Sequence, residues 1–176
     1  MCEIGFGIDG GGTRSRLCLF RLEDGREIGR FTGGSTNMYS VGQDEAMRNI
    51  EQLLRSSGVS LEKLKAGCLG SAGLSRPAEK EAFSCFFRRL LPQCSMYLCN
   101  DGETLLVGAL EATEGYCLIA GTGSLALARN REGHTARAGG LGYMLEARYG
   151  LHGRPSGVPC VPARGAIWKR RCCRIW

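Results

Sequence analysis

The segment that most constrains the fold is an apolar strand pattern that runs into three consecutive glycines. Ile4, Phe6 and Ile8 alternate with small or polar residues, which is the period-two pattern of a β-strand. Residues 9–13 read Asp-Gly-Gly-Gly-Thr, and a second apolar run follows at residues 17–20. We therefore predict a β-hairpin whose tip turns several backbone N–H groups toward an anion, because glycine has no Cβ to block the approach.

The carboxylate of Asp9 ends the first strand at a position where it could hold Mg²⁺ through water. The turn is not a Walker loop, because the chain lacks the spacing Gly-x-x-x-x-Gly-Lys-Ser/Thr. The alternative is an ordinary hairpin turn that uses glycine, with Asp9 closing the turn. Phosphate and Mg²⁺ binding are thus hypotheses at this point.

Composition and charge narrow the class of protein. The 176 residues suffice for one ordinary domain or slightly more. The net charge of +6 lies entirely in residues 146–176, which hold seven of the 23 basic residues and one of the 17 acidic ones. Because the first 145 residues are neutral overall, we expect no nucleic-acid partner.

The lack of a long apolar run or a signal peptide, together with the pattern of cysteines, predicts a cytoplasmic protein. No run of about 18 apolar residues is present, so no membrane span is expected. The first residues lack a basic segment followed by an apolar one, so no signal peptide is expected either. The ten cysteines include no Cys-x-x-Cys pair, and we interpret them as buried, reduced thiols rather than as metal ligands or disulfides.

After the first hairpin, one more strand is followed by alternating strand and helix patterns. This order predicts an α/β fold with a mixed sheet and helices on both faces. Right-handed crossovers make the later strands parallel, so one sheet edge would gather Asp9, the 10–13 turn, Ser71 and Asp101. The predicted strands are residues 26–31, 64–70 and 96–99, and two of the predicted helices are residues 42–57 and 101–112. A further helix is predicted to start near Ser75 and Pro77 and to end before Pro92.

The opening pattern returns at residue 116. A strand at 116–120, a turn of sequence Gly-Thr-Gly-Ser at 121–124 and a returning strand at 125–129 repeat the order strand, glycine turn, strand. Such a repeat indicates a duplicated unit. Two independent turns of this kind favour phosphate binding over an ordinary hairpin.

These motifs, taken in order, resemble the N-acetylglucosamine kinase/BadF-BadG-BcrA-BcrD ATPase group, which belongs with the sugar kinases, heat-shock ATPases and actin. The resemblance covers about residues 3–145, and the set is specific although each piece alone is weak. The matching pieces are Asp9-Gly10-Gly11-Gly12-Thr13, Asn37, Ser71-Ala72-Gly73, Asn100-Asp101, Gly121-Thr122-Gly123-Ser124 and Gly139-Gly140-Leu141-Gly142-Tyr143.

The resemblance implies two ribonuclease-H-like lobes with ATP in the cleft between them. Residues 1–113 would form the first lobe, an actin-like ATPase fold with a mixed five-stranded sheet and flanking helices. Residues 114–145 would be the incomplete start of a second such lobe, with three strands. The implied activity is an ATP-dependent transfer of phosphate to an amino sugar such as N-acetylglucosamine, and the resemblance leaves a homodimer open.

The resemblance also implies a role for each motif. Asp9 would position Mg²⁺, and Asp101 would act as general base for the acceptor hydroxyl. The ATP phosphates would be held by Gly10, Gly11, Gly12, Thr13, Gly121, Thr122, Gly123 and Ser124. The sugar would be faced by Asn37, Ser71, Asp101, Thr122, Gly139, Gly140 and Leu141.

The chemistry of these residue types agrees with the implied roles, but local structure offers alternatives. Phosphoryl transfer depends on positioning and charge neutralisation, and a carboxylate can accept the proton of an alcohol. Asp101 could instead be only a helix N-cap, and Asn37 only an Asx turn. The related kinases commonly have Gly-Gly-Trp-Gly where this chain has Leu141, which puts an N-acetyl pocket in doubt.

Two other functions stay open. One is an ATPase that activates a 2-hydroxyacyl-CoA dehydratase, although the cysteine motif and second turn typical of those activators are absent from the sequence. The other is a catalytically silent nucleotide- or sugar-binding protein of the same fold.

The sequence changes character after residue 145. Residues 146–176 carry no helical or strand period and hold both tryptophans and three of the five prolines. We hypothesise that this basic tail is out of frame and that the second lobe is truncated, so that the chain alone has weak or no kinase activity. The alternative is a genuine basic arm for nucleic acid or acidic lipid.

Overall fold

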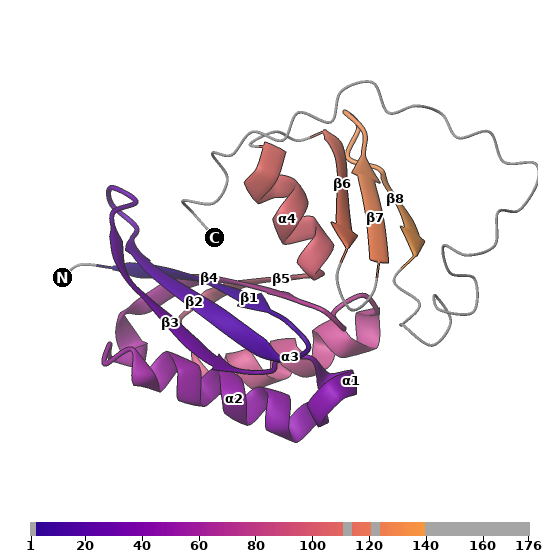
Figure 1. Ribbon diagram of the computed structural model, residues 1–176. Coiled ribbons are helices and arrows are strands. Elements are labelled where there is room, and N and C mark those ends of the chain that lie inside the picture. The colour runs from indigo at the N-terminus through magenta and orange to yellow at the C-terminus, as the bar shows by residue number, and fades with distance from the viewer. Residues whose placement is uncertain (1–2, 111–113, 121–123, 140–176) are drawn as a thin grey trace, which may run out of the picture. The chain divides into compact units, whose positions relative to one another are not determined.

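The computed structural model describes residues 3–110, 114–120 and 124–139 (Figure 1). The chain divides into two compact units after Thr104, and each unit is described by itself. The predicted lobe boundary after residue 113 and the composition-based tail at 146–176 involve residues outside the described ones. They therefore stay predictions.

The first unit is built on a mixed five-stranded sheet, as predicted. The strand order is β3-β2-β1-β4-β5, in which β1 and β2 are antiparallel, β2 and β3 are antiparallel, and β4 runs parallel to both β1 and β5. The carboxyl ends of β1, β4 and β5 consequently lie at the same edge of the sheet. The strands are β1 (Ile4–Gly10), β2 (Arg14–Arg21), β3 (Glu27–Gly34), β4 (Leu64–Ser71) and β5 (Ser95–Cys99).

Two amphipathic helices, α2 (Gln43–Ser56) and α3 (Pro77–Leu90), lie on one side of this sheet (Figure 1). The apolar face of α2 is the one that the helical period predicts, since Ala46, Ile50, Leu53 and Leu54 are all buried. These helices complete a core with the side chains of β1 and β4; the largest fully buried members of this core include Phe6, Ile8, Leu69, Phe83 and Phe87.

Helix α4 (Asp101–Leu110) begins on the other face of the sheet. A Cβ added at Gly70 would lie 2.4 Å from Thr104 Cγ2, so the first turn of α4 rests directly on β4. Gly70 is paired in register with Asp9, and paired residues of neighbouring strands share a face. The start of α4 and the Asp9 side chain are therefore on the same face, which confirms the prediction of helices on both sides.

The strand predicted for residues 26–31 extends further in the structure. Strand β3 continues to Gly34, and a one-turn helix α1 (Met38–Val41) precedes α2. Asn37 caps α1 by accepting a hydrogen bond from the Tyr39 backbone N–H at 3.0 Å. Gly42, with φ of +85°, separates α1 from α2. A single turn has no periodicity of its own, which is why the sequence pattern missed it; the same holds for the short 3₁₀ helix η1 (Leu61–Lys63).

The second unit contains a three-stranded antiparallel sheet of order β6-β7-β8, as the resemblance implied. Its strands are β6 (Gly115–Ala120), β7 (Ser124–Arg129) and β8 (Thr135–Gly139). Leu106 of α4 clusters with Cys117 of β6 and Leu127 of β7. The two strands predicted at residues 116–120 and 125–129 are thus found as the antiparallel pair β6 and β7, and the predicted turn between them lies outside the described residues.

The described cysteines are all free thiols, but they are not uniformly buried. Cys99 and Cys117 are buried, whereas Cys85 on α3 is exposed, because it lies on the solvent side of that helix. The interpretation of the cysteines as buried core residues is therefore wrong for Cys85. No helix among the described residues is long and apolar enough to cross a membrane.

Candidate functional site

The glycine turn after β1 is fixed by the neighbouring backbone. Gly10 O accepts a hydrogen bond from Ala72 N at 2.9 Å, and Gly11 N donates to Arg14 O at 3.0 Å. A Cβ at Gly10 would lie only 1.9 Å from Thr36 Oγ1, so this glycine is required by packing. A Cβ at Gly12 would meet nothing closer than 3.5 Å, and Gly12 is exposed. The turn therefore offers its open backbone at Gly12 and the exposed Thr13.

Behind the turn lies a pair of buried hydroxyl groups. Thr36 Oγ1 and Ser71 Oγ are 2.9 Å apart, and both residues are at most 1% exposed. Ser35 Oγ donates to Gly11 O at 3.0 Å and so ties the same segment to the turn. These bonds join the carboxyl ends of β3 and β4 to the tip of β1. The Ser71 hydroxyl is used inside the protein, and a sugar contact by Ser71 stays a prediction.

Asn37 lies between the glycine turn and the loop that follows β4. A Cβ at Gly73 would be 2.8 Å from Asn37 Oδ1, and a Cβ at Gly12 would be 3.9 Å from Asn37 Nδ2. The left-handed φ of Gly73, +99°, and its contact with Asn37 both exclude a side chain there. Asn37 Oδ1 caps α1, but its Nδ2 group has no hydrogen-bond partner in the described part of the chain. This amide is available to a ligand hydroxyl or carbonyl.

Asp101 is the first residue of α4, and its neighbour Asn100 caps the helix. Asn100 Oδ1 accepts from Gly102 N at 2.9 Å, and the Asn100 carbonyl accepts from Glu103 N at 3.0 Å. Asn100 is 8% exposed, whereas Asp101 is half-buried and accepts from Gly102 N at 2.9 Å. The alternative that Asp101 serves as the N-cap is therefore wrong, because Asn100 fills that position.

Asp9 is the candidate metal ligand, and its environment fits a hard cation. It lies opposite Arg16 on β2 and Gly70 on β4. Burial raises the pKa of Asp9, and the Arg16 guanidinium only partly offsets this effect. None of the described residues donates a hydrogen bond to its carboxylate. A half-buried carboxylate without a donor is suited to Mg²⁺, which keeps several waters and takes one or two protein oxygens.

The described residues contain no cluster of three or more His, Cys, Asp or Glu side chains that could hold a metal ion. Asp9 is thus not part of such a cluster among these residues.

Several predicted site residues belong to the second unit. Ser124 is the first residue of β7, and Gly139 ends β8 with φ of +80°. The remaining ones, Gly121, Thr122, Gly123, Gly140 and Leu141, lie outside the described residues, and their roles stay predictions.

Three residues at this edge were missed by the sequence reasoning. Thr36 carries no pattern that distinguishes a buried hydroxyl from a solvated one. Glu79 accepts from Ser75 N at 2.8 Å and Arg76 N at 2.7 Å. Its position two residues after Pro77 is typical of a capping glutamate, so this role could have been found. The contact of Tyr39 with Glu79 joins two helices 40 residues apart and has no local pattern.

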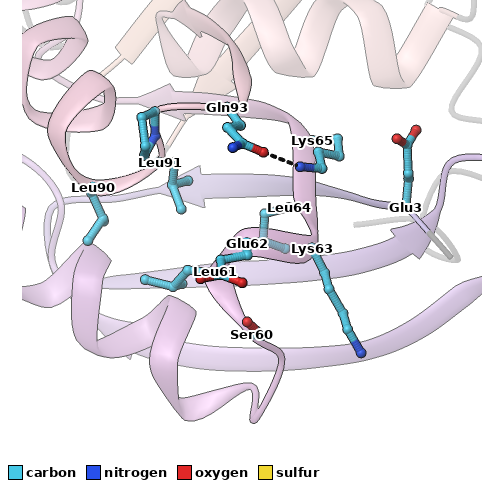
Figure 2. Close-up of a pocket in the computed structure, with 11 residues that line it drawn as sticks. Glu3, Ser60, Leu61, Glu62, Lys63, Leu64, Lys65, Leu90, Leu91 and Gln93 are labelled. Atoms are coloured by element: carbon cyan, nitrogen blue, oxygen red, sulfur yellow. Dashed lines mark hydrogen bonds between the residues drawn. The ribbon is translucent and has the colours of Figure 1, made fainter. Parts of the chain in front are cut away.

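A pocket at the opposite end of the strands does not belong to this site (Figure 2). Lys65 Nζ donates to Gln93 Oε1 at 2.8 Å beside it. Its lining comes from the amino ends of β1 and β4 and from the loop before β5, whereas ligands of open α/β sheets bind at the carboxyl ends. The lining residues are Glu3, Ser60, Leu61, Glu62, Lys63, Leu64, Lys65, Leu90, Leu91, Pro92 and Gln93.

The mixed sheet, its glycine turn after β1 and the carboxylates at its carboxyl edge define a domain of the actin-like ATPase fold. Comparison with protein families agrees with this class. The chain belongs to the BadF/BadG/BcrA/BcrD ATPase family, whose sequence model matches residues 6–148.

Curated relatives carry kinase names. The chain is 34% identical over 143 residues to an N-acetylmuramic acid/N-acetylglucosamine kinase of Clostridium acetobutylicum. The aligned region covers 79% of this chain and 46% of that protein. It is 30% identical over 156 residues to an N-acetyl-D-glucosamine kinase of Dictyostelium discoideum, and this alignment covers 81% of this chain and 49% of that protein. The chain thus spans about half the length of the curated relatives it matches.

A solved structure has the same architecture. A proposed N-acetylglucosamine kinase from Chromobacterium violaceum superposes with a TM-score of 0.65 and 26% identity, covering 81% of this chain and 50% of that one. This similarity confirms the predicted α/β fold and its actin-like class.

Proposed function

We propose that this chain carries the nucleotide- and sugar-binding elements of an ATP-dependent amino-sugar kinase, with N-acetylglucosamine as the model substrate. The observation that carries the proposal is that the open glycine turn and Gly73 both border Asn37, whose amide lies 3.9 Å from a Cβ built at Gly12 and 2.8 Å from one built at Gly73. The family membership and the names of the relatives support the same activity. Residues 1–113 would be the first ATPase lobe and residue 114 would begin the second.

In this proposal the protein groups bind ATP and the sugar, help to neutralise the phosphate charge and orient the two substrates. ATP supplies the phosphoryl group, and Mg²⁺ neutralises its charge. The backbone of residues 10–13, together with 121–124 of the second unit, would hold the phosphates, and Asp9 would hold the cation through water. Asn37 would present its Nδ2 group to the sugar. Ser71, Thr122 and residues 139–141 complete the proposed sugar-facing set.

Asp101 is the proposed proton acceptor for the sugar hydroxyl. Its place in the first turn of α4 favours a negatively charged carboxylate, because the helix N-terminus carries partial positive charge. Since Asn100 caps the helix, the Asp101 side chain is not committed to the N-cap role. Accepting the hydroxyl proton during transfer is a role that carboxylates perform well.

The test measures binding and turnover with the full chain. MgATP binding and ATP-dependent phosphorylation would be followed with N-acetylglucosamine, N-acetylmuramic acid and glucosamine. We expect MgATP and at least one sugar to bind, with slow turnover that Asp101→Asn abolishes while binding is retained. Binding without turnover would favour the silent binding protein, and failure to bind either ligand would overturn the proposal.

A further inference from the structure

Tyr39 presents an exposed aromatic ring at the edge of the candidate site. It is 63% exposed and lies in α1, two residues after Asn37. A Cβ at Gly73 would lie 3.2 Å from Tyr39 Cδ2 and 2.8 Å from Asn37 Oδ1. The ring and the Asn37 amide therefore border the same glycine.

Tyr39 is held at two points. Its backbone N–H donates to Asn37 Oδ1, and its phenol hydroxyl, at the end of the ring, donates to Glu79 Oε1. The Glu79 side chain is only 6% exposed and accepts two further backbone hydrogen bonds from Ser75 and Arg76. The hydrogen bond to Glu79 raises the pKa of Tyr39, as expected for a phenol that donates to a carboxylate. An exposed tyrosine is usually free to rotate, whereas this one is fixed by a buried carboxylate.

A fixed aromatic face beside a hydrogen-bonding amide fits a pyranose ring. A sugar presents C–H groups on its ring faces and hydroxyl groups at its rim, so it needs an apolar wall and polar partners together. We propose that Tyr39 forms the aromatic wall of the sugar site and contacts the C–H face of the amino sugar. This inference rests on the proposed function and adds a binding residue to it. Glu79 is the positioning residue that keeps the ring in place.

A purely structural role for Tyr39 would be to tie α1 to the start of α3. The two roles differ in what they require of the side chain. The tie needs the hydroxyl but no aromatic face toward the ligand, whereas the sugar wall needs the ring above all. Variants that separate the ring from the hydroxyl therefore decide between them.

The experiment measures the Kd of N-acetylglucosamine for the full chain by saturation-transfer NMR. We expect Tyr39→Ala and Tyr39→Leu to weaken binding about tenfold, which corresponds to about 1.4 kcal/mol. Tyr39→Phe keeps the ring and should stay within about threefold of the unmodified chain, or about 0.6 kcal/mol. Tyr97→Ala is the matched control, because Tyr97 is 61% exposed on β5, and it should leave the Kd unchanged.

Each outcome has a distinct meaning. Sugar binding that Tyr39→Ala and Tyr39→Leu leave unchanged would overturn this inference and keep the proposed function. A larger loss in Tyr39→Phe than in Tyr39→Leu would also overturn it, because the hydroxyl tie would then matter more than the ring. No sugar binding by the unmodified chain would remove the proposed function, and this inference with it. Far-UV circular dichroism in urea confirms that each variant is folded.

Discussion

Replacing Gly10 by alanine tests whether this glycine serves packing or ligand approach. The new Cβ would lie 1.9 Å from Thr36 Oγ1, 2.8 Å from Ser71 Oγ and 2.9 Å from Ser71 Cβ. Thr36 and Ser71 are 1% and 0% exposed, so neither can move into solvent. The Thr36 side chain must rotate, and its 2.9 Å hydrogen bond to Ser71 is then lost.

The expected cost follows from these contacts. Overpacking a buried site costs about 1–3 kcal/mol. A buried hydroxyl without a partner costs about 1–3 kcal/mol more. The reduced entropy of the unfolded chain returns about 0.4–1 kcal/mol. We therefore expect Gly10→Ala to lower the free energy of unfolding by about 2–4 kcal/mol, a large part of the roughly 5–15 kcal/mol typical of a domain.

Urea unfolding followed by far-UV circular dichroism measures this change. At a typical urea dependence the midpoint should fall by about 1–2 M. Gly12→Ala is the matched control, because its Cβ meets nothing closer than 3.5 Å, and its stability should stay within about 0.5 kcal/mol. Equal midpoints for Gly10→Ala and the unmodified chain would refute the packing argument. A loss of MgATP affinity in Gly12→Ala alone would assign ligand approach to that glycine.

Three further changes test the electrostatics and capping of the site. Asp9→Asn should raise the urea midpoint at neutral pH, because burial raises the pKa of Asp9 and its ionised form therefore disfavours folding above that pKa. The stabilisation that Mg²⁺ with ATP gives the unmodified chain should disappear in this variant; a retained effect would argue against Asp9 as the metal ligand. Asn100→Ala should cost about 1–2 kcal/mol through loss of the α4 cap, and an unchanged midpoint would show that another group caps the helix. Burial tends to raise the pKa of Glu79, but hydrogen bonds from Tyr39 and two backbone N–H groups outweigh it and lower the pKa below its ordinary value of 4.5. The stability difference between the unmodified chain and Glu79→Gln should therefore be present at neutral pH and shrink as the pH falls below 4.5; a difference that grows on acidification would contradict the assignment.

The sequence by itself determined the elements whose pattern is local. The alternation of Ile4, Phe6 and Ile8 predicted β1, and the helical period of Ala46 and Ile50 predicted the buried face of α2. The order of strands and helices was enough to predict the mixed sheet and the edge at which Asp9 and Asp101 lie. These features follow from periodicity and chain connectivity, which are properties of neighbouring residues.

Only the tertiary structure decided which polar group performs which task. Thr36 contacts Ser71, which is 35 positions away in the sequence, and Tyr39 contacts Glu79, which is 40 positions away. These contacts form because β3 and β4, which are separated in the sheet by β2 and β1, end at the same edge of it. Such contacts depend on strand order and on the height of each side chain above the sheet, and no local pattern encodes them. The glycine turn illustrates both cases: the sequence predicted its position, and the fold decided that Gly10 serves packing while Gly12 stays open.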